Sequence, residues 1–162
     1  MEIHIFWEGP YSIAQLKTLD NESSDYGIYQ VYGYHSLYGK DVLLYIGKAN
    51  RQTFYKRLKQ EDWDYYSDPD NIKIYIGRIA SKSIEDKNWE IKIDSAEKLL
   101  IYAHNPALNI VNTNSINYDE LKKVHVFNWK NFRDLFPEVS WKRWSDKYEN
   151  INEEDVIGTD EE

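Results

Sequence analysis

The sequence predicts an α+β fold, because short runs rich in aromatic and β-branched residues alternate with segments of helical spacing. The clearest strand candidates are 27–34 (GIYQVYGY), 42–48 (VLLYIGK) and 72–80 (IKIYIGRIA). Apolar residues make up 41% of the 162 residues, which is enough for a hydrophobic core. No internal repeat or linker divides the chain, so we expect a single domain over residues 1–145.

The N-terminal segment predicts a strand followed by a helix. Residues 3–7 (IHIFW) are extended in character, and a Gly-Pro turn follows them. Ile13, Leu16 and Leu19 then recur at helical spacing. Ser12 directly before them is a suitable N-cap.

The first two strand candidates are expected to form a hairpin, because Gly39 lies in the short loop between them. Alternation along a strand places Tyr45 and Gly47 on one face of the second strand. If the strands are antiparallel, Tyr29 of the first strand and Tyr45 of the second are near neighbours on the same side of the sheet.

The remaining elements are expected around and after the third strand candidate. Residues 51–60 have helical character, and a second helix is expected over 94–106, with Asp94 as its cap. Residues 123–129 (KVHVFNW) form a further strand candidate. A short helix that breaks near Pro137 is expected to follow it.

The charge of the chain is unevenly distributed. The net charge is −8, but residues 146–162 alone contain eight acidic residues and one lysine. The body over residues 1–145 therefore holds 20 acidic and 19 basic residues and is nearly neutral. The acidic segment is expected to be a flexible, solvated tail, or else a phosphate mimic that competes for a basic groove.

Composition excludes several classes of protein. The chain has no cysteine, which excludes disulfide frameworks and thiolate zinc sites and fits a reducing compartment. The N-terminus has no signal-peptide pattern, and no stretch of the sequence is apolar enough to span a membrane. We therefore expect a cytoplasmic protein without membrane contact.

Several motifs together resemble the GIY-YIG nuclease superfamily. The tripeptides GIY and YIG occur here, with Tyr29 and Tyr45 sixteen residues apart. A predicted helix follows YIGKA and carries Arg57, where the family has its helical arginine. The segment EKLLIYAHNPALN resembles the family's glutamate helix, with Glu97 followed by Asn109 after a proline.

The resemblance covers residues 27–111 and implies a fold and an activity. The implied fold is a small three-stranded antiparallel sheet flanked by helices, to which the N- and C-terminal segments would be additions. The implied activity is hydrolysis of phosphodiester bonds in nucleic acid, DNA rather than RNA, with one divalent ion, Mg²⁺ or Mn²⁺. No DNA-reading module is attached, so limited sequence specificity, a protein partner or a dimer is expected.

Phosphodiester hydrolysis needs an activated water and neutralisation of the charge on the phosphoryl oxygens. The residues that match the family motifs can supply both. Glu97 can bind the metal, because Mg²⁺ prefers oxygen ligands. Arg57 can grip the phosphate with its planar fork. Tyr29 and Tyr45 can position phosphate and deprotonate water, with Tyr29 preferred as the base, which requires a lowered phenol pKa.

Each of these roles has a structural alternative. Glu97 lies three residues after Asp94 and fits a capping box. Arg57 could be a surface residue, and the two tyrosines could simply pack across the strands.

Further candidates for substrate binding are basic or polar side chains near the same motifs. They are Lys48, Arg51, Lys56 and Asn109. Glu61 departs from the family pattern, because it places a carboxylate where phosphate is expected. A nucleic-acid- or protein-binding module that retains the fold but cleaves poorly is therefore the alternative function.

Overall fold

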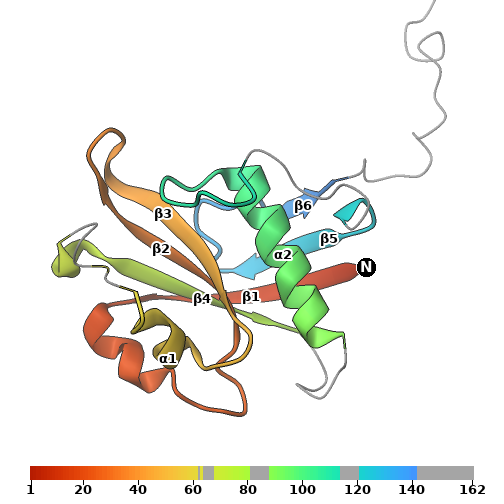
Figure 1. Cartoon of the computed structure of the whole chain (residues 1–162), viewed down its shortest axis with the longest axis horizontal. Coiled ribbons are helices and arrows are strands. Elements are labelled where there is room, and N and C mark those ends of the chain that lie inside the picture. Colours follow the sequence, from red (N-terminus) through yellow and green to blue (C-terminus); the bar gives the residue numbers. More distant parts are fainter. Residues whose placement is uncertain (62, 64–67, 81–87, 114–120, 142–162) are drawn as a thin grey trace, which may run out of the picture.

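A computed structural model of the chain describes residues 1–61, 63, 68–80, 88–113 and 121–141. In this part of the chain, six strands form one mixed sheet with the order β3-β2-β4-β1-β5-β6 (Figure 1). The strands are β1 (Glu2–Tyr11), β2 (Gly27–His35), β3 (Gly39–Ala49), β4 (Lys73–Ile79), β5 (His125–Lys130) and β6 (Glu138–Ser140). Strand β1 pairs with β5 in parallel, and the other neighbouring strands are antiparallel.

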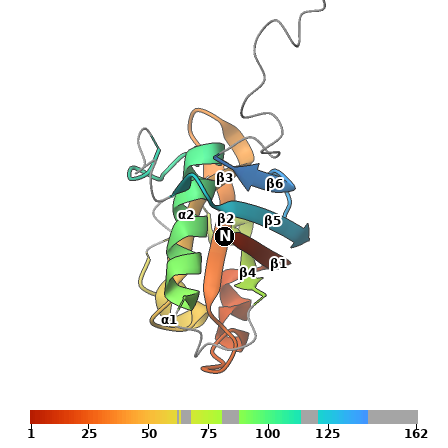
Figure 2. The same ribbon diagram turned by 90° about the vertical axis from the view of Figure 1, so that its right-hand side faces the viewer.

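The prediction of a small three-stranded antiparallel sheet flanked by helices is wrong. Strands β2, β3 and β4 do form an antiparallel group, but β1 pairs with the other edge of β4 and carries β5 and β6 beyond it. The apolar side chains of Ile3, Ile5 and Trp7 are buried together with Val126 of β5. Their burial requires the terminal segments to join the sheet, which curls as it widens (Figure 2).

Side chains on the two faces of the sheet form two hydrophobic cores. Ile28 of β2 packs in the core that includes α2 (Trp89–His104), which crosses the sheet obliquely in Figure 1. The next residue, Tyr29, belongs to the second core, with α1 (Phe54–Leu58) and the 3₁₀ helix Ile13–Thr18. This alternation along β2 places its neighbouring residues on opposite faces.

The helix boundaries differ from those expected. The N-terminal segment forms a 3₁₀ helix capped by Ser12, whose backbone N–H donates to Gln15 at 2.9 Å. The helix expected over 51–60 is restricted to α1, and a further 3₁₀ helix covers Pro69–Asn71. The short helix expected near Pro137 is a series of turns, because Lys130 and Arg133 adopt positive φ angles of 61° and 54°.

The acidic segment 146–162 lies outside the described residues, and so does the expectation that it forms a flexible tail or a phosphate mimic. No helix in the described part of the chain has the length and apolar character that crossing a bilayer requires.

His104 at the end of α2 joins this helix to the turns before β6. Its Nδ1 lies 2.9 Å from the carbonyl oxygen of Leu100, and its Nε2 accepts the backbone N–H of Phe136 at 2.8 Å. The ring is therefore neutral, with the proton on Nδ1. Burial lowers the pKa of His104, because the charged imidazolium would be poorly solvated.

We expect His104 to make folding stability depend on pH. An unfolded histidine has a pKa of about 6.5, so below this pH the unfolded chain binds the extra proton and the folded chain resists it. The contribution is thus present above pH 6.5 and is lost as pH falls, by at most about 1.4 kcal/mol per pH unit. Urea unfolding at pH 7.5 and 5.5 measures this, and His104→Gln should show a smaller loss. An equal loss in both proteins would contradict the assignment.

Candidate active site

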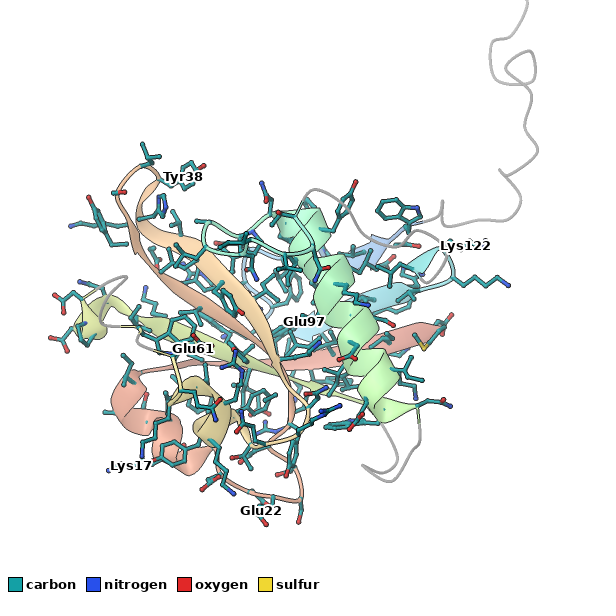
Figure 3. All side chains as sticks on the ribbon, viewed as in Figure 1. Lys17, Glu22, Tyr38, Glu61, Glu97 and Lys122 are labelled. Carbon is teal, nitrogen blue, oxygen red and sulfur yellow. The ribbon has the colours of Figure 1, made fainter. Side chains whose placement is uncertain are left out.

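The β2–β3 hairpin, α1 and α2 meet at a pocket of about 260 Å³. Four of the predicted charged residues line this pocket: Lys48, Arg51, Arg57 and Glu97. In Figure 3, Glu97 lies between α2 and β3, and Glu61 lies on the α1 side of β3. Residues from three separate elements therefore border one cavity.

Tyr29 and Tyr45 lie side by side, as the alternation of the strands predicts. Neither lines this pocket, but the charges of Arg57 and Glu97 act on both phenols. Their ring centroids are 6.1 Å apart, with an angle of 28° between the planes. Gly47 pairs with Tyr29 across the hairpin. A Cβ atom on Gly47 would lie 2.5 Å from the Tyr29 hydroxyl oxygen and 2.6 Å from Cε1 of Tyr45. The glycine of YIG thus leaves room for both phenols.

The hydroxyl of Tyr29 is unusual for a buried polar group. The side chain is 0% exposed, and its Oη has no hydrogen-bond partner among the described residues. Such a group is destabilising unless something compensates for it. Its position near Arg57 and Glu97, whose charges both act on its ionisation, places it at the candidate site rather than in an inert core.

The pKa values of the two phenols do not favour the base role. Burial raises the pKa of Tyr29 far above its ordinary value, and the charge of Arg57 opposes this only in part. Burial also raises the pKa of Tyr45. Both phenols therefore retain their protons and are suited to donating a hydrogen bond to a ligand rather than to accepting a proton. The preference for Tyr29 as general base would need a lowered pKa, and the direction here is the opposite.

Arg57 forms an ion pair with an acidic residue that follows it closely in the sequence. Its Nη1 lies 2.5 Å from Oε1 of Glu61, four residues later. An anionic ligand at this guanidinium would therefore have to compete with the carboxylate of Glu61. Lys56, by contrast, pairs with Glu22 at 2.8 Å and does not line the pocket, so the structure does not bring it to the site.

Lys48 bridges two carboxylates of α2. Its Nζ lies 2.8 Å from Glu97 and 2.9 Å from Asp94. Burial would lower the pKa of Lys48, but the two hydrogen bonds outweigh it and raise the pKa. Burial raises the pKa of Glu97, whose side chain is 13% exposed, and Lys48 partly offsets this. The ammonium therefore opposes the effect of burial on the pKa of this carboxyl group without cancelling it.

The capping-box alternative for Glu97 is wrong. Helix α2 begins at Trp89, so Asp94 and Glu97 lie in its interior. Asp94 also accepts a hydrogen bond from the side-chain amide of Asn50 at 3.3 Å. Asp94 is thus a member of the site that the sequence did not indicate as one, because its spacing from Glu97 matches a helix start.

Asn109 supports the site rather than lining it. Its Oδ1 accepts the backbone N–H of Ile46 at 2.9 Å, and its Nδ2 donates to the Ile46 carbonyl oxygen at 2.9 Å. Strand β3 is at the edge of the sheet, so this amide takes the place of a missing neighbouring strand. Asn109 therefore positions β3, which carries Tyr45 and Lys48.

The residues present fit a hard divalent ion with few protein ligands. Among the described residues, no three or more His, Asp or Glu side chains gather into a metal-binding group. Glu97, with Asp94 one turn away, offers carboxylate oxygens at the wall of an open pocket. Mg²⁺ retains several waters and needs only one or two carboxylates plus phosphate oxygens, so this donor set is compatible with it.

Comparison with known proteins gives no relative to set beside this geometry. No family model, no curated protein and no solved structure matches the chain.

Proposed function

We propose that this protein is a cytoplasmic, metal-dependent endonuclease that hydrolyses phosphodiester bonds of DNA. The observation that supports this most is the meeting of Lys48, Arg57 and Glu97 at one pocket beside the Tyr29–Tyr45 pair. The site thus offers cations for phosphate, a carboxylate for a hard metal ion and phenols for hydrogen bonding.

Each side chain has a definite task in this proposal. Arg57 exchanges Glu61 for a phosphoryl oxygen and stabilises the charge of the transition state. Glu97 would hold Mg²⁺ or Mn²⁺, and the bound ion would supply positive charge at the phosphate in addition to that of Arg57. Lys48 stays paired with Asp94 if the ion takes its place on Glu97. The neutral Tyr29 hydroxyl is buried beside the site, so it orients the attacking water or the phosphate only once substrate binding has exposed it.

The alternative is a module that binds nucleic acid or protein but cleaves it poorly. One observation favours it: Arg57, Lys48 and Glu97 are all engaged in internal ion pairs. A ligand must first break these pairs, which weakens both metal and phosphate binding. Binding without cleavage in the presence of Mg²⁺ and Mn²⁺ would identify this alternative.

The nuclease proposal is tested by replacing Glu97 with glutamine. This change keeps the shape of the side chain and removes the charge that would hold the ion. We expect conversion of supercoiled plasmid to nicked circles to fall by roughly 100-fold or more, since metal stabilisation amounts to several kcal/mol. Glu90→Gln on the exposed first turn of the same helix is the matched control and should cleave like the wild type. Equal nicking by the two variants would reject the role of Glu97.

Tyr29→Phe should separate function from stability. The change removes a buried hydroxyl that has no partner in the described structure, so we expect stability to be unchanged or to rise by about 1 kcal/mol. Cleavage should fall by about 10²-fold if the hydroxyl orients the reacting groups. Urea unfolding and plasmid nicking of one preparation measure both effects. A variant that is less stable and fully active would show that the phenol serves packing alone.

A further inference from the structure

A second cavity, of about 440 Å³, lies between α1 and the 3₁₀ helix Ile13–Thr18. Its apolar lining includes Leu16 and Leu58, and aromatic side chains are supplied by Tyr55 and Trp63. This volume is within the usual range for small-molecule sites. None of the roles proposed for the active-site residues involves this cavity.

The second cavity is a direct neighbour of the candidate active site. Glu61 lines the cavity, and its carboxylate is the group that pairs with Arg57 at 2.5 Å. Trp63 also lines it and packs against Tyr45, with ring centroids 5.8 Å apart. A group seated in the cavity would therefore lie beside a phosphate held by Arg57.

The charges around the cavity are suited to an anion attached to an aromatic group. Lys17 and Lys59 are exposed and line the cavity. The Lys59 ammonium lies 5.8 Å from the centroid of the Tyr55 ring, so a positive charge and an aromatic face are presented together. The acidic group in the lining, Glu61, is paired with Arg57 until a phosphate displaces it.

A nucleotide has this combination of a flat aromatic base and a phosphate, but its base is accessible only when it is unpaired. Bases in a duplex are stacked on each other, whereas an unstacked base can lie against an aromatic side chain. We propose that this cavity receives the base of an unpaired nucleotide adjacent to the phosphate at Arg57. The protein would then select single-stranded or locally unpaired nucleic acid over a continuous duplex. This inference rests on the proposed function for its substrate.

The test measures binding without cleavage. Fluorescence anisotropy in EDTA compares a labelled single strand, the duplex of the same sequence and the duplex with an unpaired 3′ overhang. We expect the single strand and the overhang to bind about 10-fold more tightly than the duplex. The double variant Tyr55→Leu/Lys59→Gln should lose about 10-fold of the single-strand affinity while binding the duplex unchanged.

A matched control carries the same pair of changes elsewhere. Tyr38 and Lys40 are exposed at the far end of the β2–β3 hairpin, and Tyr38→Leu/Lys40→Gln should bind like the wild type. The same measurement with a single strand of RNA shows whether the bound base comes from RNA or from DNA. Loss of affinity in the Tyr55/Lys59 variant with either strand supports the cavity.

The inference and the proposed function fail in different ways. Equal affinity for single strand and duplex, or equal affinity of the Tyr55/Lys59 variant and the wild type, would overturn the cavity assignment even if plasmid is nicked. Selective single-strand binding that depends on Tyr55 and Lys59, without any cleavage in Mg²⁺ or Mn²⁺, would support the cavity and reject the nuclease.

Discussion

Replacing Arg57 by alanine is expected to reduce cleavage by about 10³-fold, a loss typical of an arginine that stabilises a phosphoryl transition state. Two effects act in the same direction. The variant loses the guanidinium, and it leaves the carboxylate of Glu61 without its partner at the place proposed for phosphate. An unpaired negative charge there repels the substrate.

The matched control is the preceding residue on α1. Lys56 has the same charge, but it pairs with Glu22 at 2.8 Å and lies outside the pocket. We expect Lys56→Ala to keep cleavage within about twofold of the wild type, because an exposed ion pair contributes little. Single-turnover cleavage of a labelled oligonucleotide measures both variants. Equal losses would mean that α1 contributes only general positive charge.

The second large effect concerns stability and is expected for Gly27→Ala. Gly27 begins β2 with a φ of 145°, a conformation that side chains rarely adopt. A Cβ atom there would lie 2.1 Å from the carbonyl oxygen of Gly77 in β4, and this backbone cannot move without breaking the pairing of β2 with β4. We expect a loss of more than about 4 kcal/mol in the free energy of unfolding, measured with urea.

Gly39→Ala separates the collision from the backbone strain. Gly39 also has a positive φ, of 91°, but a Cβ atom there would have nothing within 4 Å. The change should therefore destabilise only by the strain, about 1–3 kcal/mol. If Gly27→Ala destabilises no more than Gly39→Ala, then β2 and β4 do not approach each other as closely as described.

The central part of the fold follows from local sequence patterns. The hairpin of β2 and β3 was predictable because aromatic alternation and Gly39 act over short distances in the chain. The same alternation correctly placed Tyr29 and Tyr45 on one side. Residue spacing alone was sufficient for these features.

The rest of the sheet depends on contacts between distant segments. β1 and β5 are more than a hundred residues apart, and their parallel register is fixed by burial of both strands under α2. Local periodicity indicates such strands but not their partners. The predicted sheet of three strands therefore lacked the strands that pair only through these distant contacts.

Within the candidate site, it was harder to predict which residues form ion pairs with each other than which residues line the pocket. The Arg57–Glu61 pair could have been predicted from its spacing of four residues, although Glu61 lies beyond the end of α1. The role of Asp94 could not, because Lys48 reaches it from a strand 46 residues earlier. The amide of Asn109 was expected near the substrate, but it pairs with β3 because that edge has no neighbouring strand.

Incorporation of oxygen from water is the most direct test of a hydrolytic site at Glu97 and Arg57. A defined oligonucleotide is cleaved under single-turnover conditions with Mg²⁺ in ¹⁸O-labelled water, and the phosphate at the new end is analysed by mass spectrometry. A hydrolytic site predicts one ¹⁸O atom in that phosphate with the wild-type protein, and product formation that is slower by about 100-fold or more with Glu97→Gln. An unlabelled product, or the same labelled product at the same rate from Glu97→Gln, would contradict it.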